Sequence, residues 1–557
     1  MASVHELNVY YESRVVGTIS VHADGPSFSY APEWLTTRGA FPVSLLMPST
    51  PRPVPPRRFL PWAANLLPES SQLRAIGLQL GAAPEDVIGI LAELGRDTAG
   101  ALSIGQPGTR STHGWKPIGS ERELEKILDE LPSKPFLVGE DGVSMSLAGV
   151  QTKIGVAIDA EGRICIPING APSTWIMKPD AERLYGGVQN EALCLALAKR
   201  LGLNAPEITT GAAGRRTYLL VKRYDRVEQQ GHWRRLHQED FCQALGKPPS
   251  AKYESNQTGI PGPTLAEMFA TTRNAMQAPD IINLLDYVIF NVLSCNTDAH
   301  AKNYSMMISG RGFKLAPIYD VTCALAWDHV TRNMAQKIAG KNRGEHLKRR
   351  HWQRFAADVG LNAPRLLARV EALAKGALAE TRNAAAEVEA MPAGAHPLMT
   401  QVSEAIEGRA RALLHGLADA TGAEPEATTA RSKPAPATKA KKKAAPKKKA
   451  TTAKPRRVSK QKRRAPDARI TSRHDICVKS MRLAHAEAGV DSDLRRDDVA
   501  RSAAGCPEGS RRAQQKGANA GGEGSCRDPA PADRARWRSC HGAPCATDGA
   551  GNGGFRH

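Results

Sequence analysis

Short runs in which apolar and polar residues alternate open the chain and predict β-strands. They cover residues 7–11, 15–21 and 26–30, and turn-forming residues separate them. Alternation with a period of two directs one face of each strand toward a core and the other toward water. We therefore expect a small antiparallel sheet at the start of the chain, followed by helical segments around residues 70–94.

The hydrophobic pattern changes to the helical period in the second half of the chain. From about residue 238 to about residue 417 apolar residues recur every three or four positions, most clearly in 364–388 and 402–417. Residues 284–293 are mostly apolar and predict a buried helix. A β-rich region followed by a helix-rich region is typical of an α+β fold.

A polar turn after this buried helix carries the candidate chemistry. It runs from Asn296 to Asn303 and places Asp298 five residues before Asn303, and Asp320 ends a strand-like segment, residues 313–319. An Asp that can take a proton, an Asn and a later Asp that can hold a hard cation suit phosphoryl transfer. The reason is that Mg²⁺ prefers oxygen ligands from few side chains plus phosphates. An ordinary turn rich in Asp and Asn is the alternative.

A loop with two small-residue points, between residues 144 and 156, offers a place for phosphate groups. Ala148-Gly149 and Gly155 lie between β-like flanks, a setting in which backbone N–H groups can approach an anion. The loop lacks the Gly-x4-Gly-Lys-Ser/Thr spacing of a Walker loop. A plain β-hairpin is the alternative explanation.

Three further segments are compatible with the same chemistry. Lys178 ends an apolar β-like run, where its ammonium could point inward to phosphates or lie at a solvated edge. A predicted helix, 192–201, follows Asn190, a reasonable N-cap, and Glu191 could pair with Lys178. The strand 217–226 turns polar at its end, as a hinge strand beside an adenine or an ordinary strand end would.

Most of the net charge of +20 lies near the end of the 557-residue chain. Residues 431–470 hold 17 Lys or Arg and one acidic residue, a net charge of +16, while residues 471–557 carry +3 and the first 430 residues carry +1. Low hydrophobicity with like charges predicts a disordered tail. The tail offers contact to nucleic acid of any sequence, which salt would weaken, and a solvated segment without a partner is the alternative.

Cysteine usage and the lack of long apolar runs indicate where the protein resides. No pair among the ten cysteines has CxxC spacing, so we expect a reducing compartment and no structural zinc. The first residues lack a basic region followed by an apolar core, and no run approaches about 18 apolar residues. We therefore expect a cytoplasmic protein that does not span a membrane.

Nine short motifs occur in a fixed order between residues 65 and 320. They are Asn65-Leu66-Leu67-Pro68-Glu69, Gly95-Arg96-Asp97, Ser146-Leu147-Ala148-Gly149-Val150-Gln151-Thr152-Lys153, Asn190-Glu191, Lys222-Arg223-Tyr224-Asp225-Arg226, Gln238-Glu239-Asp240, Lys252-Tyr253-Glu254, Thr297-Asp298-Ala299-His300-Ala301-Lys302-Asn303 and Tyr319-Asp320. Each is weak alone, but the ordered set resembles the HipA family of serine/threonine-protein kinases. These are the toxin halves of bacterial toxin–antitoxin pairs.

The resemblance implies a two-lobed, protein-kinase-like α+β fold with an N-terminal β-rich subdomain and a mainly helical C-terminal lobe. We expect the N-terminal subdomain in residues 1–110, the kinase N-lobe with its glycine-containing loop and hinge in 111–235, and the C-lobe with the catalytic loop and metal site in 236–420. The disordered Lys/Ala/Pro-rich basic tail would occupy 421–470, and a disordered low-complexity extension 471–557.

The resemblance also implies ATP and Mg²⁺ as cofactors and assigns roles by position. Asp298 would be the general base or would orient the substrate hydroxyl, and Asn303 and Asp320 would hold Mg²⁺. Ser146 would be an autophosphorylation site, where a phosphate would add about −1.5 to −2 charges in the place where ATP docks. The residues expected to contact the nucleotide are Leu147, Ala148, Gly149, Val150, Gln151, Thr152, Lys153, Lys178, Lys222, Tyr224, His300 and Lys302.

The sequence departs from the family pattern at three points. Ala299 stands where Gly is usual, which a turn with negative φ tolerates. Lys222 stands where an acidic hinge residue is expected, which matters little if backbone groups bind adenine. The third departure is the basic tail, residues 431–470, which the family does not have.

The resemblance implies two partners and leaves two other functions open. A family member phosphorylates a Ser or Thr of a protein, for which glutamyl-tRNA synthetase is the suggested target, and binds a helix-turn-helix antitoxin of the HipB type. The alternatives are a catalytically silent co-repressor whose tail holds DNA, and a small-molecule kinase of the aminoglycoside type. The intact turn with Asp298 and Lys178 favours an active enzyme, while the N-terminal subdomain and the loop at Ser146 argue against the small-molecule kinase.

Overall fold

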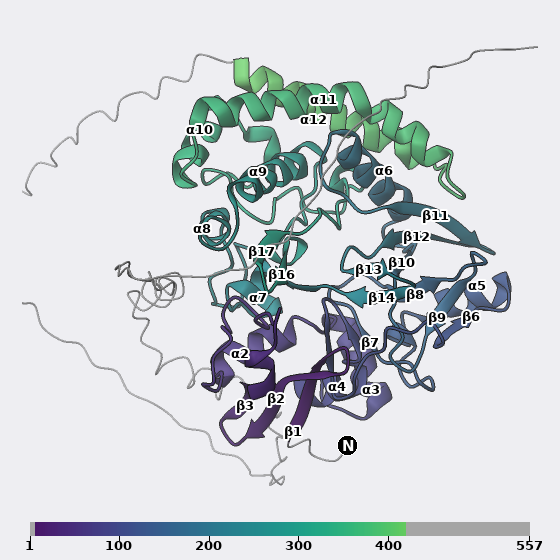
Figure 1. Cartoon of the computed structure of the whole chain (residues 1–557). Coiled ribbons are helices and arrows are strands. Elements are labelled where there is room, and N and C mark those ends of the chain that lie inside the picture. Colours follow the sequence, from purple (N-terminus) through teal and green to yellow (C-terminus); the bar gives the residue numbers. More distant parts are fainter. Residues whose placement is uncertain (1–5, 419–557) are drawn as a thin grey trace, which may run out of the picture. The chain divides into compact units, whose positions relative to one another are not determined.

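The computed structural model describes residues 6–418, whose helices and strands form three successive groups (Figure 1). Residues 1–5 and 419–557 are not described, so the expected tail (421–470) and extension (471–557) lie outside the described residues. Within the described range the mixture of a β-rich first half and a helical second half agrees with the α+β prediction.

The first group is an antiparallel sheet with the strand order β3-β2-β1-β5, covered by short helices. The three predicted strands and the helical segments at 70–94 are confirmed. Helix α2 was not predicted, because the preceding Pro-rich segment indicates a loop; Pro56 instead occupies the first turn, where its missing N–H costs nothing. The elements are β1 (Glu6–Tyr11), β2 (Arg14–His22), β3 (Gly25–Tyr30), α1 (Pro32–Thr36), α2 (Pro56–Ala64), α3 (Ser70–Leu80), α4 (Val87–Leu94) and β5 (Leu102–Ile104).

The second group is a six-stranded antiparallel sheet with the strand order β11-β12-β10-β8-β9-β6. Helix α6 packs on β11 and β12, and α5 packs on β11 (Figure 1). The elements are β6 (Trp115–Pro117), α5 (Glu121–Glu130), β8 (Ile154–Ile158), β9 (Ile164–Pro167), β10 (Trp175–Pro179), α6 (Gly187–Arg200), β11 (Ile208–Ala213) and β12 (Arg216–Lys222).

The glycine-containing loop is not the turn of a hairpin. Strand β7 (Met145–Ser146), before the loop, pairs in parallel with β4 (Asp97–Thr98), whereas β8, after the loop, pairs with β9 and β10. A hairpin would pair β7 with β8, so the hairpin alternative is wrong. The loop instead connects a strand that pairs with the end of the N-terminal group to the six-stranded sheet.

Helix α6 begins earlier than predicted, and Asn190 is not its N-cap. The helix starts at Gly187, after Gly186 in a left-handed conformation with a φ of 75°. Asn190 therefore lies inside the helix, where its side chain donates to the Cys323 carbonyl (3.0 Å) and accepts from the Cys323 N–H (2.7 Å). This pair of bonds ties α6 to the segment that follows Asp320.

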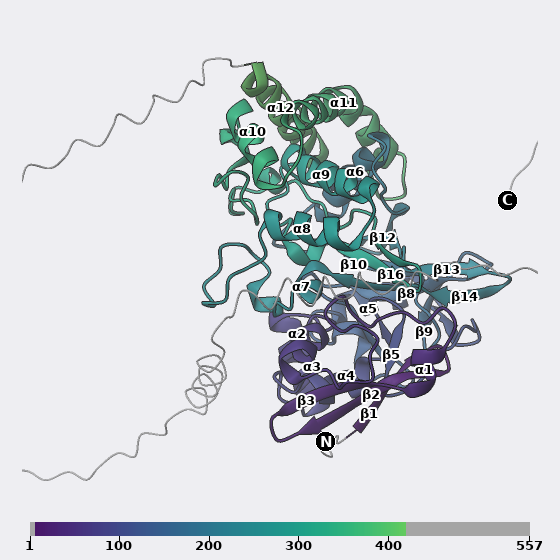
Figure 2. The same ribbon diagram turned by 60° about the vertical axis from the view of Figure 1, so that its left-hand side comes forward.

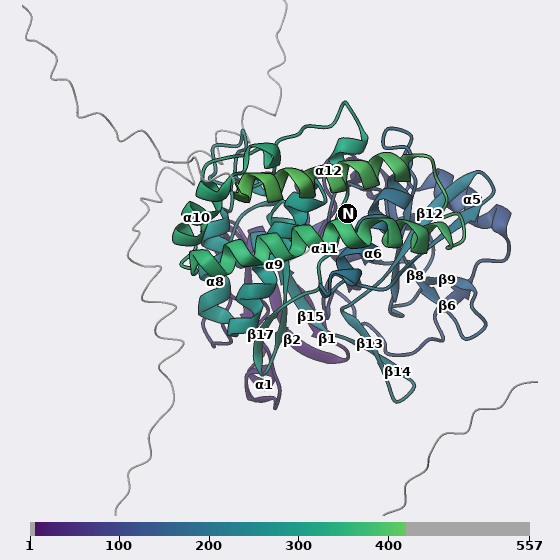
Figure 3. The ribbon, with the colours of Figure 1, turned by 90° about the horizontal axis from the view of Figure 1, so that it is seen from above.

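The third group is mainly helical and confirms the predicted helices at 284–293, 364–388 and 402–417. Helices α11 and α12 lie side by side, and α11 also contacts α6 and α9 (Figure 3). The strand-like segment 313–319 is a strand only to Leu315, because β17 pairs with β16 no further. The helices are α7 (Phe241–Ala244), α8 (Leu265–Ala275), α9 (Ala278–Leu293), α10 (Arg349–Asp358), α11 (Ala363–Glu389) and α12 (Leu398–Ala418).

Five strands accompany these helices. The hairpin of β13 (Arg226–Gln229) and β14 (His232–Arg235) follows the six-stranded sheet, and Figure 2 shows it projecting from the neighbouring strands. The strands β15 (His237–Asp240), β16 (Ser305–Ser309) and β17 (Gly312–Leu315) form a small antiparallel sheet. This sheet joins the start of the C-terminal group to the segment after the polar turn, because β15 precedes α7 and β16 follows the turn.

No helix between residues 6 and 418 is long and apolar enough to cross a membrane. The five cysteines in this range are free and buried, as expected for small apolar side chains.

Candidate active site

A cavity of about 690 Å³ lies between the glycine-containing loop, strand β10, the end of β12 and the polar turn after α9. Its volume is in the range of sites that bind small molecules and cofactors. Every predicted site residue except Ser146 lines it. Residues that are far apart in the sequence are thus brought to one place, although the sequence spacing alone could not show this.

The polar turn holds Asp298 and Asn303 on the same wall of the cavity. Asn296 accepts a hydrogen bond from the Asp298 N–H (3.0 Å), and the Asn303 side-chain amide donates to the Asp298 carbonyl (2.8 Å). The φ of Ala299 is not positive, so the missing glycine causes no strain there. The turn is therefore held by hydrogen bonds from its own side chains, and Asn303 is bonded directly to the backbone of Asp298.

The Asp298 side chain faces the cavity and is 60% exposed. The Tyr253 hydroxyl donates a hydrogen bond to its Oδ1. Desolvation by the cavity wall raises the pKa of Asp298, the bond from Tyr253 and the charge of Lys252 oppose this rise, and the carboxylates of Asp320 and Glu69 add to it. A carboxylate with a raised pKa is better suited to accept a proton near neutral pH.

His300 and Lys302 point their side chains into the protein beneath the turn. Burial lowers the pKa of His300 well below its usual value, so the imidazole is neutral at pH 7 and contributes no charge to the site. The Lys302 ammonium donates to the carbonyl and side-chain oxygens of Asn65 (3.1 and 2.8 Å) and lies 3.7 Å from carboxylate oxygens of Glu69 and Asp240. Lys302 therefore holds the N-terminal subdomain against the turn.

Lys178 lies between two carboxylates at the back of the cavity. Its Nζ is 2.7 Å from Glu191 Oε1 and also donates to Asp320 Oδ1, so the suggested pairing with Glu191 is present. Burial alone would lower the pKa of Lys178, but Asp320 and Glu191 outweigh it and raise the pKa. Lys178 is thus held as a buried cation, and the alternative of a solvated edge residue is wrong.

Asp320 and Asn303 offer oxygen atoms that fit a magnesium ion. Within residues 6–418 the second carboxylate oxygen of Asp320 and the side-chain carbonyl of Asn303 accept no hydrogen bond, and both residues line the cavity. Asp320 has a φ of +59°, a conformation that Asp tolerates better than most residues. Few protein oxygens beside space for phosphates suit Mg²⁺ better than a cage of protein ligands does.

The glycine-containing loop forms the wall opposite the turn. Gly149 has a φ of +113°, a backbone conformation that favours glycine over residues with a Cβ. Lys153 is buried, donates to the Ala148 carbonyl (2.9 Å) and has a lowered pKa because of desolvation. The loop also touches the N-terminal subdomain, since Gln72 donates to the Val150 carbonyl. Leu147, Gln151 and Thr152 complete the lining.

Ser146 lies outside the cavity and is fully buried. It belongs to β7, opposite Thr98 of β4, and its hydroxyl donates to the Leu66 carbonyl (2.8 Å). Its hydroxyl is not exposed to the space in which a nucleotide would be bound. In this conformation a phosphate on Ser146 would have no room.

The predicted hinge lies at the end of β12. The Lys222 side chain turns to Glu207 (2.8 Å), so its charge is paired. The Tyr224 hydroxyl donates to Gln238, and its ring packs on Tyr319, the residue before Asp320 (ring centroids 5.8 Å apart). The end of β12 and the segment that leads to Asp320 are therefore in direct contact.

A buried cluster of charges connects the hinge to the N-terminal group. Asp97 of β4 contacts Arg226 (2.8 Å) and Arg235 (3.3 Å), and Asp225 pairs with Arg223 (2.8 Å). All five side chains are nearly excluded from solvent. The polar end of the predicted strand 217–226 is thus an internal joint of the protein.

Four residues of the site were not assigned a role from the sequence. Asn65 and Glu69 of the N-terminal subdomain reach the polar turn, Lys252 donates to Glu69 (2.9 Å), and Tyr253 bonds to Asp298. They lie in two of the nine ordered motifs, which is the only signal in the sequence that marks them. The N-terminal subdomain therefore forms part of the cavity wall.

The chain resembles known proteins over most of the residues that the structure describes. The family model for the HipA N-terminal domain matches residues 7–105, and that for the HipA-like C-terminal domain matches residues 145–381. The protein Y4mE of Sinorhizobium fredii is 35% identical over 379 residues, which are 66% of this chain and 89% of Y4mE. The serine/threonine-protein kinase toxin HipA of Shewanella oneidensis is 28% identical over 348 residues, 60% of this chain and 78% of that protein.

A solved structure confirms the fold. The chain superimposes on a structure of the Shewanella oneidensis toxin–antitoxin system that contains HipA, HipB and operator DNA, with a TM-score of 0.64 and 24% identity. The match covers 73% of this chain and 97% of the matched chain. Two family models in order, a relative matched over most of its length and this common fold lead to one conclusion: the chain belongs to the HipA family.

Proposed function

We propose that this protein is an ATP- and Mg²⁺-dependent serine/threonine-protein kinase. The observation that carries the proposal is the convergence of Asp298, Asn303, Asp320 and Lys178 on one cavity of nucleotide size. Phosphoryl transfer asks for little covalent chemistry from the protein, so a positioned acceptor and neutralised phosphate charge supply most of the rate. The cavity has a candidate residue for each of these tasks.

The side chains divide the work as follows. Asp298 accepts or orients the proton of the substrate hydroxyl at its exposed carboxylate, while Tyr253 holds the other oxygen. Lys178 presents its ammonium to the nucleotide phosphates, and Glu191 keeps it charged and in place. Asn303 and Asp320 hold Mg²⁺, which neutralises phosphate charge when it is bound with ATP. The loop from Leu147 to Lys153 covers the phosphates.

We propose a helix-turn-helix antitoxin of the HipB type as the partner that controls the enzyme. The support is the HipA of Shewanella oneidensis, which forms a complex with HipB and operator DNA and shares the fold of this chain. A protein with an accessible Ser or Thr is the proposed substrate class. The basic segment 431–470 would add contact to nucleic acid of any sequence.

Transfer of label from ATP tests the enzyme directly and also tests autophosphorylation at Ser146. Full-length protein incubated with γ-labelled ATP and Mg²⁺ should label itself slowly, because Ser146 must leave its buried position before it can react. The Ser146→Ala variant should lose the self-label and still label a protein substrate. Mass spectrometry locates the phosphate.

A different result would contradict each part of the proposal. If wild-type protein labels neither itself nor any protein of a cell extract, the kinase function is wrong. If the Ser146→Ala variant labels itself as fast as wild type, the enzyme is active but the assigned autophosphorylation site is wrong. The matched control is the Ser27→Ala variant, which changes a half-buried serine of β3 that does not line the cavity.

Replacing Tyr253 with phenylalanine should shift the acid limb of the kcat profile to higher pH. The Tyr253 hydroxyl bonds to the charged form of Asp298, so its loss raises the pKa of Asp298. A larger fraction of Asp298 is then protonated at a given pH. We expect a shift of less than about one pH unit and less than about a tenfold loss of rate at pH 8. Rates of label transfer between pH 5 and 9 measure it, with Tyr185→Phe, an exposed tyrosine, as the control. A shift to lower pH would contradict the assignment.

A further inference from the structure

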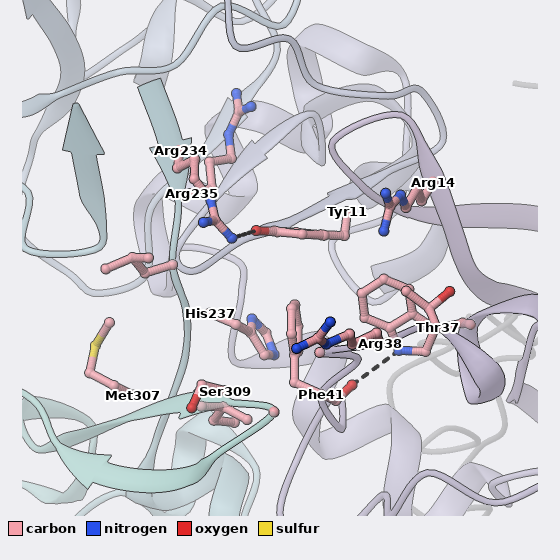
Figure 4. A pocket seen from close by; sticks show the side chains of 15 residues that line it. Tyr11, Arg14, Thr37, Arg38, Phe41, Arg234, Arg235, His237, Met307 and Ser309 are labelled. Atoms are coloured by element: carbon pink, nitrogen blue, oxygen red, sulfur yellow. Dashed lines mark hydrogen bonds between the residues drawn. The ribbon is translucent and has the colours of Figure 1, made fainter. Parts of the chain in front are cut away.

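A second cavity lies between the N-terminal subdomain and the strands β14, β15 and β16. Its volume is about 310 Å³, and it shares no lining residue with the candidate active site, although β15 and β16 contribute different residues to each. Figure 4 shows Tyr11, Arg14, Arg38 and Phe41 from the N-terminal subdomain among the residues that line it, together with Arg234 and His237. The volume is at the lower end of the range for small-molecule sites.

The cavity is strongly basic. Arg14, Arg38, Arg234 and Arg235 line it, and no Asp or Glu does. Arg235 forms an ion pair with Asp97, but within residues 6–418 Arg14, Arg38 and Arg234 form no ion pair. Arg14 and Arg38 are exposed, and Arg234 is oriented by a bond from its Nη2 to the Tyr11 hydroxyl (2.9 Å). Three guanidinium groups without carboxylate partners that line one cavity favour an anionic ligand group such as phosphate.

Aromatic side chains, most of them buried, also line the cavity. The ring of Phe41 lies edge-on to Tyr11 and Trp34 and stacks on His237, with a centroid distance of 5.1 Å to His237. His237 donates to the Val43 carbonyl (2.8 Å), and burial lowers its pKa to about 4, so it is a neutral ring at pH 7. Such aromatic surfaces favour a planar ligand group.

One end of the cavity is closed, which disfavours a continuing peptide. The β16–β17 turn at Gly310 packs so closely on the N-terminal subdomain that a Cβ there would lie 2.9 Å from the Gly39 carbonyl and 3.0 Å from the Ala40 carbonyl. A compact ligand fits this space better than an extended chain does.

We propose that this cavity binds a small organic phosphate whose phosphate group is carried on a flat aromatic ring. The phosphate would contact Arg14, Arg38 and Arg234, and the ring would lie over Phe41. The ligand would touch both the N-terminal subdomain and the kinase core, because β15 and β16 lead from the cavity to Asp240 and Ser305 at the active site.

Phenyl phosphate is the probe that tests the site, and isothermal titration calorimetry of the full-length protein at 150 mM salt measures its affinity. The Arg14→Gln, Arg38→Gln double variant should bind it about tenfold more weakly, since it loses two charge-assisted contacts at the surface. Arg52→Gln removes an exposed arginine of the same subdomain outside the cavity and should bind as wild type does. The basic segment 431–470 is common to all variants, so its contribution cancels.

Two further ligands separate charge from ring. Inorganic phosphate should bind more weakly than phenyl phosphate, and benzyl alcohol should not bind measurably. The site assignment is overturned if the double variant, or either single variant should the double one misfold, binds phenyl phosphate as wild type does. Equal affinity for inorganic phosphate overturns the aromatic part, and much tighter binding of a phosphotyrosine peptide overturns the small-molecule assignment.

Discussion

Replacing Asp298 with asparagine is expected to lower the rate of phosphoryl transfer on the order of 10³-fold, because the carboxamide cannot accept the proton of the attacking hydroxyl. The substitution keeps the size of the side chain, and the two bonds that fix the turn use the backbone of Asp298 and are retained. Single-turnover transfer of label from ATP measures the rate. Nucleotide affinity, measured by calorimetry, should change little, since Lys178 and the glycine-containing loop are untouched.

A loss of transfer rate without a loss of nucleotide affinity would distinguish a role in the chemical step from a structural role. Asp328→Asn is the matched control, because Asp328 is exposed, follows the same segment as Asp320 and does not line the cavity. It should transfer phosphate as wild type does. If the Asp298→Asn variant keeps the wild-type rate, Asp298 is not the residue that handles the hydroxyl. If it loses nucleotide binding together with rate, its role is structural.

The parts of the site that were predictable from the sequence are those that lie within one local motif. Asp298 and Asn303 belong to one turn, and a short stretch of chain limits how such residues can be placed. Lys178 and Glu191 were a suggested pair, and the structure brings them together because α6, which carries Glu191, packs on the sheet that contains β10 and Lys178. Helices with a clear period, such as α11 and α12, were also correctly located.

The parts that were not predictable depend on contacts between distant segments. Lys302 bonds to Asn65, 237 positions earlier, and Lys252 bonds to Glu69, 183 positions earlier. No local pattern specifies which surfaces meet. The same cause explains the shorter strand near Asp320, because its end is set by how far β16 offers a pairing partner. The start of α6 was misplaced because Asn190 is a good N-cap by type, while the backbone actually turns at Gly186.

The joint between the N-terminal group and the hinge is another feature set by distant contacts. Asp97 accepts bonds from the backbone N–H and hydroxyl of Ser173 (3.1 and 2.6 Å) as well as from Arg226 and Arg235. The cluster contains three arginines and two aspartates, all buried. Since Arg223 and Asp225 flank Tyr224, the geometry of the hinge depends on the same cluster.

Replacing Asp97 with asparagine should lower the free energy of unfolding by about 3–5 kcal/mol, because Arg223 and Arg226 are then left with the carboxylate of Asp225 and the buried Arg235 loses its carboxylate partner. Chemical denaturation of the full-length protein measures the loss. The exposed Asp24→Asn variant, which removes a carboxylate from the β2–β3 turn, is the control and should change stability by less than about 1 kcal/mol. A similarly small change in the Asp97→Asn variant would contradict the role of the cluster.

The pH dependence of unfolding gives this prediction a second, independent readout. Burial alone would raise the pKa of Asp97, but Arg226, Arg223 and Arg235 outweigh it and hold the pKa well below its ordinary value. A carboxyl group whose pKa is lower in the folded state stabilises the protein above its unfolded pKa of about 4, and this contribution is lost as the pH falls further. Wild-type stability should therefore fall more steeply below about pH 4 than that of the Asp97→Asn variant. Equal slopes would show that Asp97 does not carry its charge in the folded protein, and the loss of stability would then need another cause than unpaired arginines.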